Sequence, residues 1–237
     1  GSLISESGPG CTWSENAHEF RLTPWSNDPV SDSSGEAFYI RDEERGHFWS
    51  PTPLPSRGAM PYVSRHGFGY SVFEYAERGI RSELWVYVAL DASVKFTVLK
   101  VRNECGRSRR LSVTGYVEWV LGDLRPKSAM HVITEVDPGS GALFARNPYH
   151  TEFGGRVAFF NVDDATRTVS GDRTEFIGRN GTLRSPAAMT RSRLSGKVGA
   201  GLDPCAAIQV PFEIADGEER EFIFTLGAGR DAGDARS

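Results

Sequence analysis

Apolar and polar residues alternate along several stretches of this chain, and this pattern constrains the fold more than any other feature. From Ser82 to Leu90, the residues Leu84, Val86, Val88 and Leu90 share one face, opposite Glu83, Trp85 and Tyr87, as in a strand with one buried side. The pattern returns in three further sets: Leu111, Val113, Val117, Trp119 and Leu121; Ile208, Val210, Phe212 and Ile214; Phe222, Phe224 and Leu226.

Strands at this density, separated by clusters of Gly, Pro, Asn and Asp, predict an all-β fold: a two-layer antiparallel β-sandwich with little helix. At 39% hydrophobic residues the chain can bury a substantial core. We expect that core to include Leu84, Val86, Val88, Val113, Val117 and Phe224.

The connections between these strands carry turn signals. Residues 103–107 (Asn-Glu-Cys-Gly-Arg) and 137–141 (Asp-Pro-Gly-Ser-Gly) are predicted to be hairpin connections, because Gly supplies positive φ and Pro presets a turn. Asn180-Gly181 is a third turn signal. The one local helix signal is 185–189, where Ser185 can cap and Pro186 can occupy the first turn. No repeat or linker divides the sequence, so we expect one domain over residues 1–237.

Charge and cysteine content exclude several classes of protein. The net charge of -4 is dispersed, and no run of bases exceeds Arg109-Arg110, so nucleic acid is not an expected partner. Cys11, Cys105 and Cys205 are widely separated, which argues against a disulfide framework and against a zinc site. We therefore expect reduced thiols in the cytoplasm, no metal and no cofactor. No apolar run is long enough to span a bilayer.

Motifs of the common hydrolases and nucleotide-binding enzymes are missing: there is no Gly-x-Ser-x-Gly, no phosphate loop ending in Lys-Ser or Lys-Thr, and no His-Glu-x-x-His. The run 42–44 (Asp-Glu-Glu) offers neighbouring carboxylates, as glycoside hydrolysis needs. Neighbours in a strand point to opposite faces, however, and Arg45-Gly46 follows. We interpret the run as a solvated hairpin tip without a catalytic role.

Five aromatic residues could stack on a sugar ring, because a pyranose presents C–H groups that an aromatic face can cover. They are Trp13, Trp25, Trp49, Phe68 and Tyr70. Aromatic residues of a β-sandwich are more often core residues, and we interpret each of these first in that way. Trp49, whose backbone Ser50-Pro51 fixes, is kept as a candidate substrate contact.

Several longer motifs follow one another in a fixed order: 11–14 (CTWS), 21–24 (RLTP), 25–32 (WSNDPVSD), 49–55 (WSPTPLP), 65–71 (RHGFGYS), 118–119 (EW), 172–178 (DRTEFIG) and 201–205 (GLDPC). The spacing of tryptophan, acid and proline in the third and fourth is not what a generic strand or turn needs. In this order the motifs resemble the N-terminal β-sandwich domain of the cellobiose and chitobiose phosphorylase family (glycoside hydrolase family 94). The resemblance is strongest to the phosphorylase-like module of cyclic β-1,2-glucan synthases.

The resemblance implies a galactose-mutarotase-like supersandwich that packs on an (α/α)6 catalytic barrel of the same polypeptide. In that family the barrel supplies an aspartate as general acid, and phosphate attacks the sugar; this chain is expected to stop where the linker to the barrel begins. The expected partners are a β-glucan or small saccharide, the barrel, and a second copy in a homodimer. The parent would trim linear β-1,2-glucan and be anchored in the bacterial inner membrane through other domains.

Two other functions stay open beside this non-catalytic role: an independent carbohydrate-binding module and a mutarotase-like enzyme. Aldose mutarotases use a His and a Glu on a sugar ring, which brings His66 and His131 into consideration. Beside Gly67, however, His66 is interpreted as a hydrogen-bonded turn residue. The family's opening strands are not found in this sequence, so we expect an exposed sheet edge.

The loop from Gly122 to His131 is the main candidate site, because its counterpart in cellobiose phosphorylases carries an Arg-Asn pair that reaches the substrate. Here the aligned positions are Ala129 and Met130, so that pair does not carry over. Arg125 and Lys127 are the predicted substitutes for substrate binding. Arg179 and Asn180, which follow the 172–178 motif, form a second candidate loop.

Overall fold

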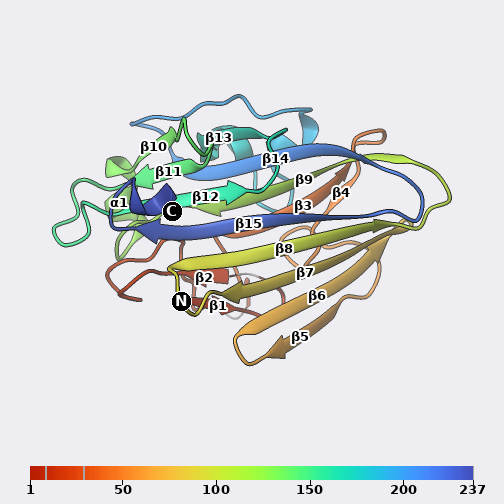
Figure 1. Cartoon of the computed structure of the whole chain (residues 1–237), viewed down its shortest axis with the longest axis horizontal. Coiled ribbons are helices and arrows are strands. Elements are labelled where there is room, and N and C mark those ends of the chain that lie inside the picture. Colours follow the sequence, from red (N-terminus) through yellow and green to blue (C-terminus); the bar gives the residue numbers. More distant parts are fainter. Residues whose placement is uncertain (9, 29, 237) are drawn as a thin grey trace.

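Two antiparallel sheets stacked face to face form the body of the protein (Figure 1). The computed structural model describes residues 1–8, 10–28 and 30–236, so Pro29 of the 25–32 motif lies outside the described residues. The larger sheet has eight strands in the order β10 (Ile133–Val136), β11 (Leu143–Arg146), β12 (Val157–Val162), β15 (Glu219–Gly229), β8 (Val94–Asn103), β7 (Ile80–Val88), β6 (Tyr70–Glu77) and β5 (Val63–Gly67).

The smaller sheet has five strands in the order β13 (Thr168–Asp172), β14 (Pro204–Ile214), β9 (Arg109–Glu118), β3 (Glu36–Asp42) and β4 (Phe48–Trp49). A short pair, β1 (Ser2–Ile4) and β2 (Gly10–Thr12), lies at the N-terminus. Neighbouring strands pair antiparallel in all three sheets of the described residues. The predicted two-layer antiparallel sandwich is confirmed.

The core lies between the two sheets. Phe224 of β15 meets Phe38 of β3 with ring centroids 5.2 Å apart, and Phe160 of β12 lies 5.8 Å from Phe224. Gly115 interrupts the apolar alternation of β9 at this contact: a Cβ there would lie 2.8 Å from the Phe224 ring and 2.9 Å from the Phe160 ring. The missing side chain therefore makes room for two phenylalanines of the opposite sheet.

Most of the predicted core is buried as expected: Leu84, Val86, Val113, Val117 and Phe224. Val88 is only half-buried, which corrects its assignment to the core. Leu90, placed on the same face by the alternation, is fully exposed. The reason is that β7 ends at Val88, so the two last apolar residues of the pattern fall at and beyond the end of the strand.

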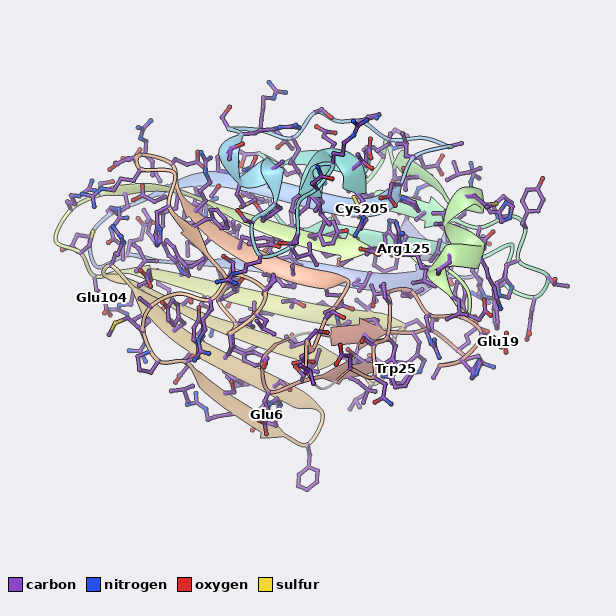
Figure 2. All side chains as sticks on the ribbon, turned by 180° about the vertical axis from the view of Figure 1, so that it is seen from behind. Glu6, Glu19, Trp25, Glu104, Arg125 and Cys205 are labelled. Carbon is purple, nitrogen blue, oxygen red and sulfur yellow. The ribbon has the colours of Figure 1, made fainter. Side chains whose placement is uncertain are left out.

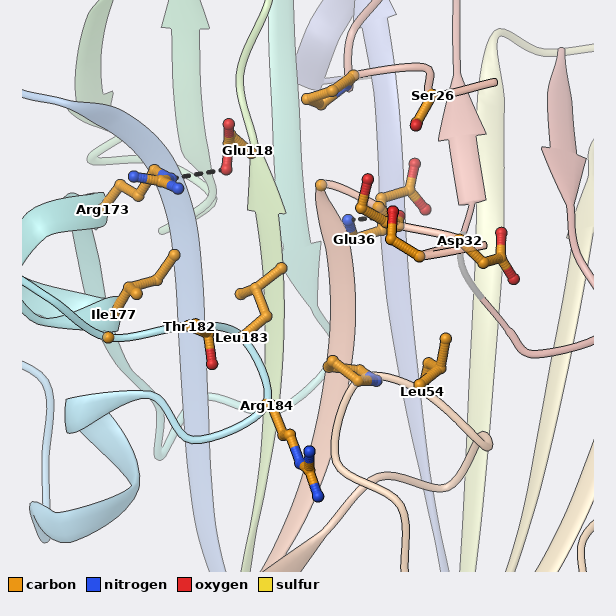
Figure 3. Close-up of a pocket in the computed structure, with 17 residues that line it drawn as sticks. Ser26, Asp32, Glu36, Leu54, Glu118, Arg173, Ile177, Thr182, Leu183 and Arg184 are labelled. Carbon is orange, nitrogen blue, oxygen red and sulfur yellow. Dashed lines mark hydrogen bonds and ion pairs between the residues drawn. The ribbon is translucent and has the colours of Figure 1, made fainter. Parts of the chain in front are cut away.

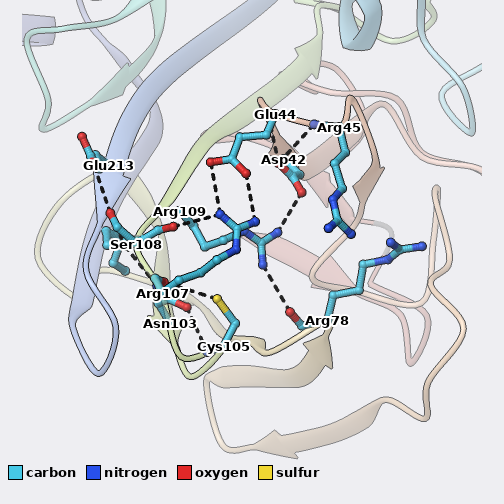
Figure 4. A network of polar contacts seen from close by, with 11 residues as sticks. Asp42, Glu44, Arg45, Arg78, Asn103, Cys105, Arg107, Ser108, Arg109 and Glu213 are labelled. Atoms are coloured by element: carbon cyan, nitrogen blue, oxygen red, sulfur yellow. Dashed lines mark hydrogen bonds and ion pairs between the residues drawn. The ribbon is translucent and has the colours of Figure 1, made fainter.

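The two predicted hairpins have different outcomes. Residues 137–141 do connect paired strands, β10 and β11, and the Asp137 carboxylate accepts a hydrogen bond from the Ser140 N–H at 2.8 Å. Residues 103–107 do not form a hairpin, because β8 pairs with β7 and β15, whereas β9 pairs with β3 and β14. This connection crosses from one sheet to the other, and the side chain of Asn103 donates to the carbonyls of Arg107 and Ile214 there (Figure 4).

The acidic run 42–44 corrects a second expectation. It forms the tight turn between β3 and β4, but Asp42 is fully buried and pairs with Arg109 at 2.8 Å (Figure 4). Glu43 accepts a hydrogen bond from Ser112 at 2.5 Å, and Glu44 pairs with Arg107. The run is therefore an ion-paired anchor at this end of the sandwich rather than a solvated tip.

Helix is scarce, as predicted. The short helices are α1 (Arg125–Ser128), α2 (Arg173–Ile177) and the 3-10 turns Ala129–His131, Ala187–Thr190 and Asp234–Arg236. The helix signal at 185–189 corresponds to the second 3-10 turn, where Pro186, not Ser185, is the capping residue. α2 begins at Arg173 because the Asp172 carboxylate accepts the Thr174 N–H at 3.0 Å. No helix in the described part of the chain is long and apolar enough to cross a membrane.

The larger sheet has an exposed edge at β5. This strand pairs only with β6, and four of its five residues are exposed. The hairpin that joins β5 to β6 carries Phe68, which is fully exposed. The described structure thus has an open sheet edge at β5.

Candidate functional site

A groove of about 620 Å³ opens beside the smaller sheet (Figure 3). Its floor holds Glu118, at the end of β9, and Arg173, at the start of α2. Three segments form its walls. The first contributes Pro24, Ser26 and residues 31–36, the second contributes Leu54 and Pro55, and the third contributes residues 181–184. We call this hollow the Glu118 groove.

Two glycines let these walls approach the sheet. A Cβ on Gly35 would lie 2.3 Å from the Pro24 ring, so only glycine allows the chain to enter β3 so close to that proline. A Cβ on Gly181 would lie 2.0 Å from the carbonyl oxygen of Ile177. The predicted Asn180-Gly181 turn therefore folds back on α2 and leads into the wall formed by 181–184.

Four charged residues form a closed network at the groove floor. Glu118 pairs with Arg125 at 2.8 Å and with Arg173 at 2.7 Å, and Asp203 pairs with the same two arginines, 3.2 Å from Arg173. Burial alone would lower the pKa of Arg173, but Glu118 and Asp203 raise it above its usual value. Each of the two carboxylates is thus held between two guanidinium groups.

Arg125 therefore has a role that the sequence did not predict. Instead of projecting from a flexible loop, it belongs to α1, is only partly exposed, and ties the 122–131 segment to β9 and to Asp203. Figure 2 shows Arg125 and Glu19 toward one end of the sheets and Glu104 at the opposite end. We expect Arg125→Ala to destabilise the fold, unlike the same substitution at a solvated loop position.

Lys127 lies on the other side of α1 and is exposed. Its ammonium bonds to Asp123 at 2.6 Å, and this bond lowers the pKa of Asp123. Both residues line a second, shallow hollow of about 530 Å³, where His131 stacks on Tyr149 with centroids 4.3 Å apart. Arg125 lines neither of the two hollows, because its side chain turns to Glu118 and Asp203.

Arg179 and Asn180 are both exposed on the turn that follows α2. They do not line the Glu118 groove, but they directly precede its 181–184 wall. Trp49 is 1% exposed and packs in the main core, so its ring is not open to a ligand in this structure. This placement corrects Trp49 as a substrate contact and agrees with the core interpretation.

The core interpretation fails for three other aromatic residues. Trp25 is 48% exposed, Tyr70 is 44% exposed and Phe68 is fully exposed, whereas Trp13 is half-buried. The ring of Trp25 is held in place by Arg21, whose guanidinium carbon lies 5.5 Å from the ring centroid. Exposed aromatic surface is therefore present, but at positions other than the one kept from the sequence.

The two histidines considered as acid and base do not converge. His66 lies on β5 rather than in a turn, which corrects that part of the expectation, but it is hydrogen-bonded as expected: its Nδ1 is 2.8 Å from the Ser71 hydroxyl. His131 ends the 122–131 segment. Neither is paired with a carboxylate in the described residues, and no metal-binding cluster of His, Cys, Asp or Glu occurs in the part of the chain that was described.

Sequence reasoning missed Glu118, Arg173, Asp203 and Arg184 as site residues. The first three occur in motifs that carried the family resemblance, 118–119, 172–178 and 201–205. That was the available signal. Nothing in the local sequence indicates that these motifs meet, because they lie on separate elements joined only by the tertiary fold.

Comparison with known proteins gives a consistent picture. The family model for the glycosyl hydrolase 94 supersandwich domain matches residues 1–237. The chain is 35% identical over 229 residues to the cyclic beta-(1,2)-glucan synthase NdvB of Rhizobium meliloti, covering 96% of this chain and 8% of the synthase. It is 25% identical to the N,N'-diacetylchitobiose phosphorylase of Vibrio furnissii, covering 98% of this chain and 30% of that enzyme.

Solved structures with a similar arrangement include a putative kojibiose phosphorylase from the human microbiome (TM-score 0.43, 5% identity, 95% of this chain and 27% of that one). A putative aldose 1-epimerase from Escherichia coli is also similar (TM-score 0.44, 9% identity, 88% of each chain). The family match over the whole chain, together with the observed sandwich, shows that the protein belongs to glycosyl hydrolase family 94 as its supersandwich domain.

Proposed function

We propose that this domain is a non-catalytic part of a larger β-glucan-processing enzyme, in which it packs on a catalytic barrel and lends loops to the carbohydrate cleft. The chain spans 8% of the glucan synthase and 30% of the chitobiose phosphorylase that it resembles, so most of such an enzyme lies in other domains. The names of these two relatives support a β-glucan or a related saccharide as the substrate class of the parent.

The network at the groove floor carries the non-catalytic part of this proposal. An inverting reaction on a glycosidic bond needs a carboxylic acid that can give up a proton. The carboxylates of Glu118 and Asp203, the acids of the network, are instead each engaged by two arginines. The network is suited to holding α1 and α2 against the smaller sheet.

The residues that would reach the barrel are the exposed ones around this network. Lys127 is on one side of α1, and Arg179 and Asn180 are on the turn after α2. All three carry side-chain N–H donors, which can bind sugar hydroxyls. We assign them a substrate-positioning role in the parent enzyme, and Arg125 the role of fixing the helix that carries Lys127.

We place the domain in the cytoplasm, with any membrane anchor of the parent in its other domains. The three cysteines are unpaired, and two of them, Cys11 and Cys205, are buried. Burial raises the pKa of the Cys11 thiol to about 11. Buried, protonated thiols are typical of a reducing compartment.

The test uses the complete parent enzyme with Lys127→Ala and Arg179→Ala. We expect kcat/KM on linear β-1,2-glucan to fall about tenfold, or ~1.4 kcal/mol, with an unchanged melting temperature, because both side chains are exposed. Lys100→Ala is the matched control: Lys100 is a partly exposed lysine on β8, away from α1. Unchanged turnover in both test variants, or an equal loss in the control, would refute the positioning role.

The isolated chain provides a second test. Phosphate consumption with a β-1,2-linked disaccharide and anomer interconversion by polarimetry should both equal the background rate. Turnover that disappears in His66→Ala would overturn the non-catalytic assignment.

A further inference from the structure

Four of the motifs that carried the family resemblance meet in the Glu118 groove. Ser26, Ser31 and Asp32 come from the 25–32 motif, and Leu54 and Pro55 from 49–55. Glu118 comes from 118–119, and Arg173 and Ile177 from 172–178. These segments are far apart in the chain, and the strand pattern does not require their residue types.

We propose that the Glu118 groove is an oligosaccharide-binding site of the domain itself, with Trp25 as a stacking residue at its mouth. This site goes beyond the proposed function and does not rest on it, because Lys127, Arg179 and Asn180 take no part in lining the groove. The occupant is a short neutral saccharide held by this chain alone.

The size and continuity of the hollow suit such a ligand. Its volume of about 620 Å³ lies within the range of about 300–1,000 Å³ that is usual for small-molecule sites. A smaller hollow of about 190 Å³ shares Pro24, Ser26, Asp32 and Ser33 with it and adds Trp25. The two hollows therefore adjoin each other, with Trp25 in the smaller one and the Glu118–Arg173 pair in the larger one.

The lining has the mixed chemistry that a sugar requires. The hydroxyl groups of Ser26 and Ser33 can both donate and accept hydrogen bonds, and that of Ser31, which donates to the Asp28 carboxylate at 2.6 Å, can accept one. The carboxylate of Asp32 and the guanidinium of Arg184 offer one strong acceptor and one strong donor, and Arg184 has no partner among the described residues. A sugar hydroxyl, which is donor and acceptor at once, can bind to every one of these groups.

Apolar surface completes the match. Leu54, Pro55 and Leu183 line the groove and can cover the C–H faces of pyranose rings. At the mouth, Trp25 is 48% exposed while Arg21 holds its ring, so little side-chain freedom is lost when a sugar stacks on it.

Charge distinguishes this ligand from an anion. The acids Asp32, Glu36 and Glu118 line the groove together with the bases Arg173 and Arg184. Arg173 is already paired with Glu118 and Asp203. A phosphate or an acidic peptide would meet carboxylates without a surplus of positive charge. A neutral saccharide meets no such repulsion.

The test titrates the isolated chain with linear β-1,2-gluco-oligosaccharides in a calorimeter, up to about 10 mM, which detects a Kd of ~1 mM or better. We expect saturable binding, and about a tenfold weaker Kd in both Trp25→Ala and Arg184→Ala. Melting curves should stay unchanged, because both side chains are exposed. Phe68→Ala, which removes a fully exposed aromatic ring from the β5–β6 hairpin, is the matched control.

Three outcomes would overturn the proposal. The first is the absence of binding by the folded wild-type chain. The second is an unchanged Kd in Trp25→Ala and Arg184→Ala, and the third is an equal loss in Phe68→Ala. The loop substitutions in the parent enzyme test a different set of residues, so failure of the groove and failure of the proposed function can be told apart.

Discussion

Replacing Lys95 by methionine should expose the cost of a charge buried between the two sheets. Lys95 of β8 and Glu36 of β3 form an ion pair in which the residues are 3% and 8% exposed. The Lys95 ammonium also donates to the Thr12 hydroxyl at 2.7 Å. Glu36 accepts hydrogen bonds from Thr12 at 2.6 Å and from Thr23 at 2.7 Å. The pair therefore links both sheets to the N-terminal segment.

The structure sets the expected size of the effect. Removing one partner of a buried ion pair costs about 3–5 kcal/mol, because the remaining charge is left uncompensated. Glu36 would keep its two hydroxyl donors, so we expect Lys95→Met to lower the free energy of unfolding by an amount near the lower end, ~3 kcal/mol. In the double variant Lys95→Met/Glu36→Gln no charge of this pair is left. Its loss in the free energy of unfolding should therefore be well below the sum of the losses in the two single variants.

The effect should depend on pH. Burial alone would raise the pKa of Glu36, but Lys95 and the two threonines lower it below the usual value. The stability from this group is thus present above the unfolded pKa of about 4.3 and is lost as pH falls through the folded pKa. Without Lys95, burial should raise the Glu36 pKa, so the variant loses stability as pH rises. The difference between the proteins is therefore largest near pH 7.

Urea unfolding, followed by tryptophan fluorescence at several pH values, measures both the loss in the free energy of unfolding and its pH dependence. Lys100→Met is the matched control, because Lys100 lies on the same strand but is partly exposed, and its ammonium is as far as 3.9 Å from Glu83 and from Glu221. The control substitution should lower the free energy of unfolding by less than about 0.5 kcal/mol. A Lys95→Met cost no larger than that of the control, or one that is the same near pH 4 and near pH 7, would refute the reasoning.

Three further predictions concern packing and the groove floor. Val86→Asp should abolish the cooperative thermal transition, because Val86 is 7% exposed in the core, whereas the control Val63→Asp, on exposed β5, should melt cooperatively. Gly115→Ala should cost about 1–3 kcal/mol in urea unfolding, because its Cβ would meet the Phe224 ring; a neutral result would contradict that contact. Arg125→Ala should cost ~1–3 kcal/mol, since it breaks two ion pairs, and a cost near zero would show that it is a free surface residue.

Much of the architecture was predictable because alternation is a local property. Side chains of a strand point to opposite faces in turn, so the apolar series in β7, β9, β14 and β15 already indicates which face is buried. The Asp-Pro-Gly-Ser-Gly run likewise predicts its own hairpin. The prediction fails where a strand ends: Val88 is the last paired residue of β7 and is only half-buried, and Leu90 lies beyond the strand and is exposed.

Prediction of the site was weaker. Trp25 and Trp49 occur in similar Trp-Ser motifs, yet one is 48% exposed and the other 1%. Arg125 was predicted to bind substrate from an exposed loop, whereas its side chain pairs with Glu118 and Asp203, which belong to distant motifs. Exposure and ion pairing both depend on which segments cover a residue, and local sequence does not contain that information.

By itself, the sequence determined the fold class, the buried faces of the long strands and one hairpin, because each depends on interactions among neighbouring residues. Only the tertiary structure decided that residues 103–107 cross between sheets, that Asp42 is buried, and that Glu118, Arg173 and Asp203 meet beside a groove. Those features depend on contacts between residues far apart in the chain. Such contacts form only when both sheets bury their apolar faces together.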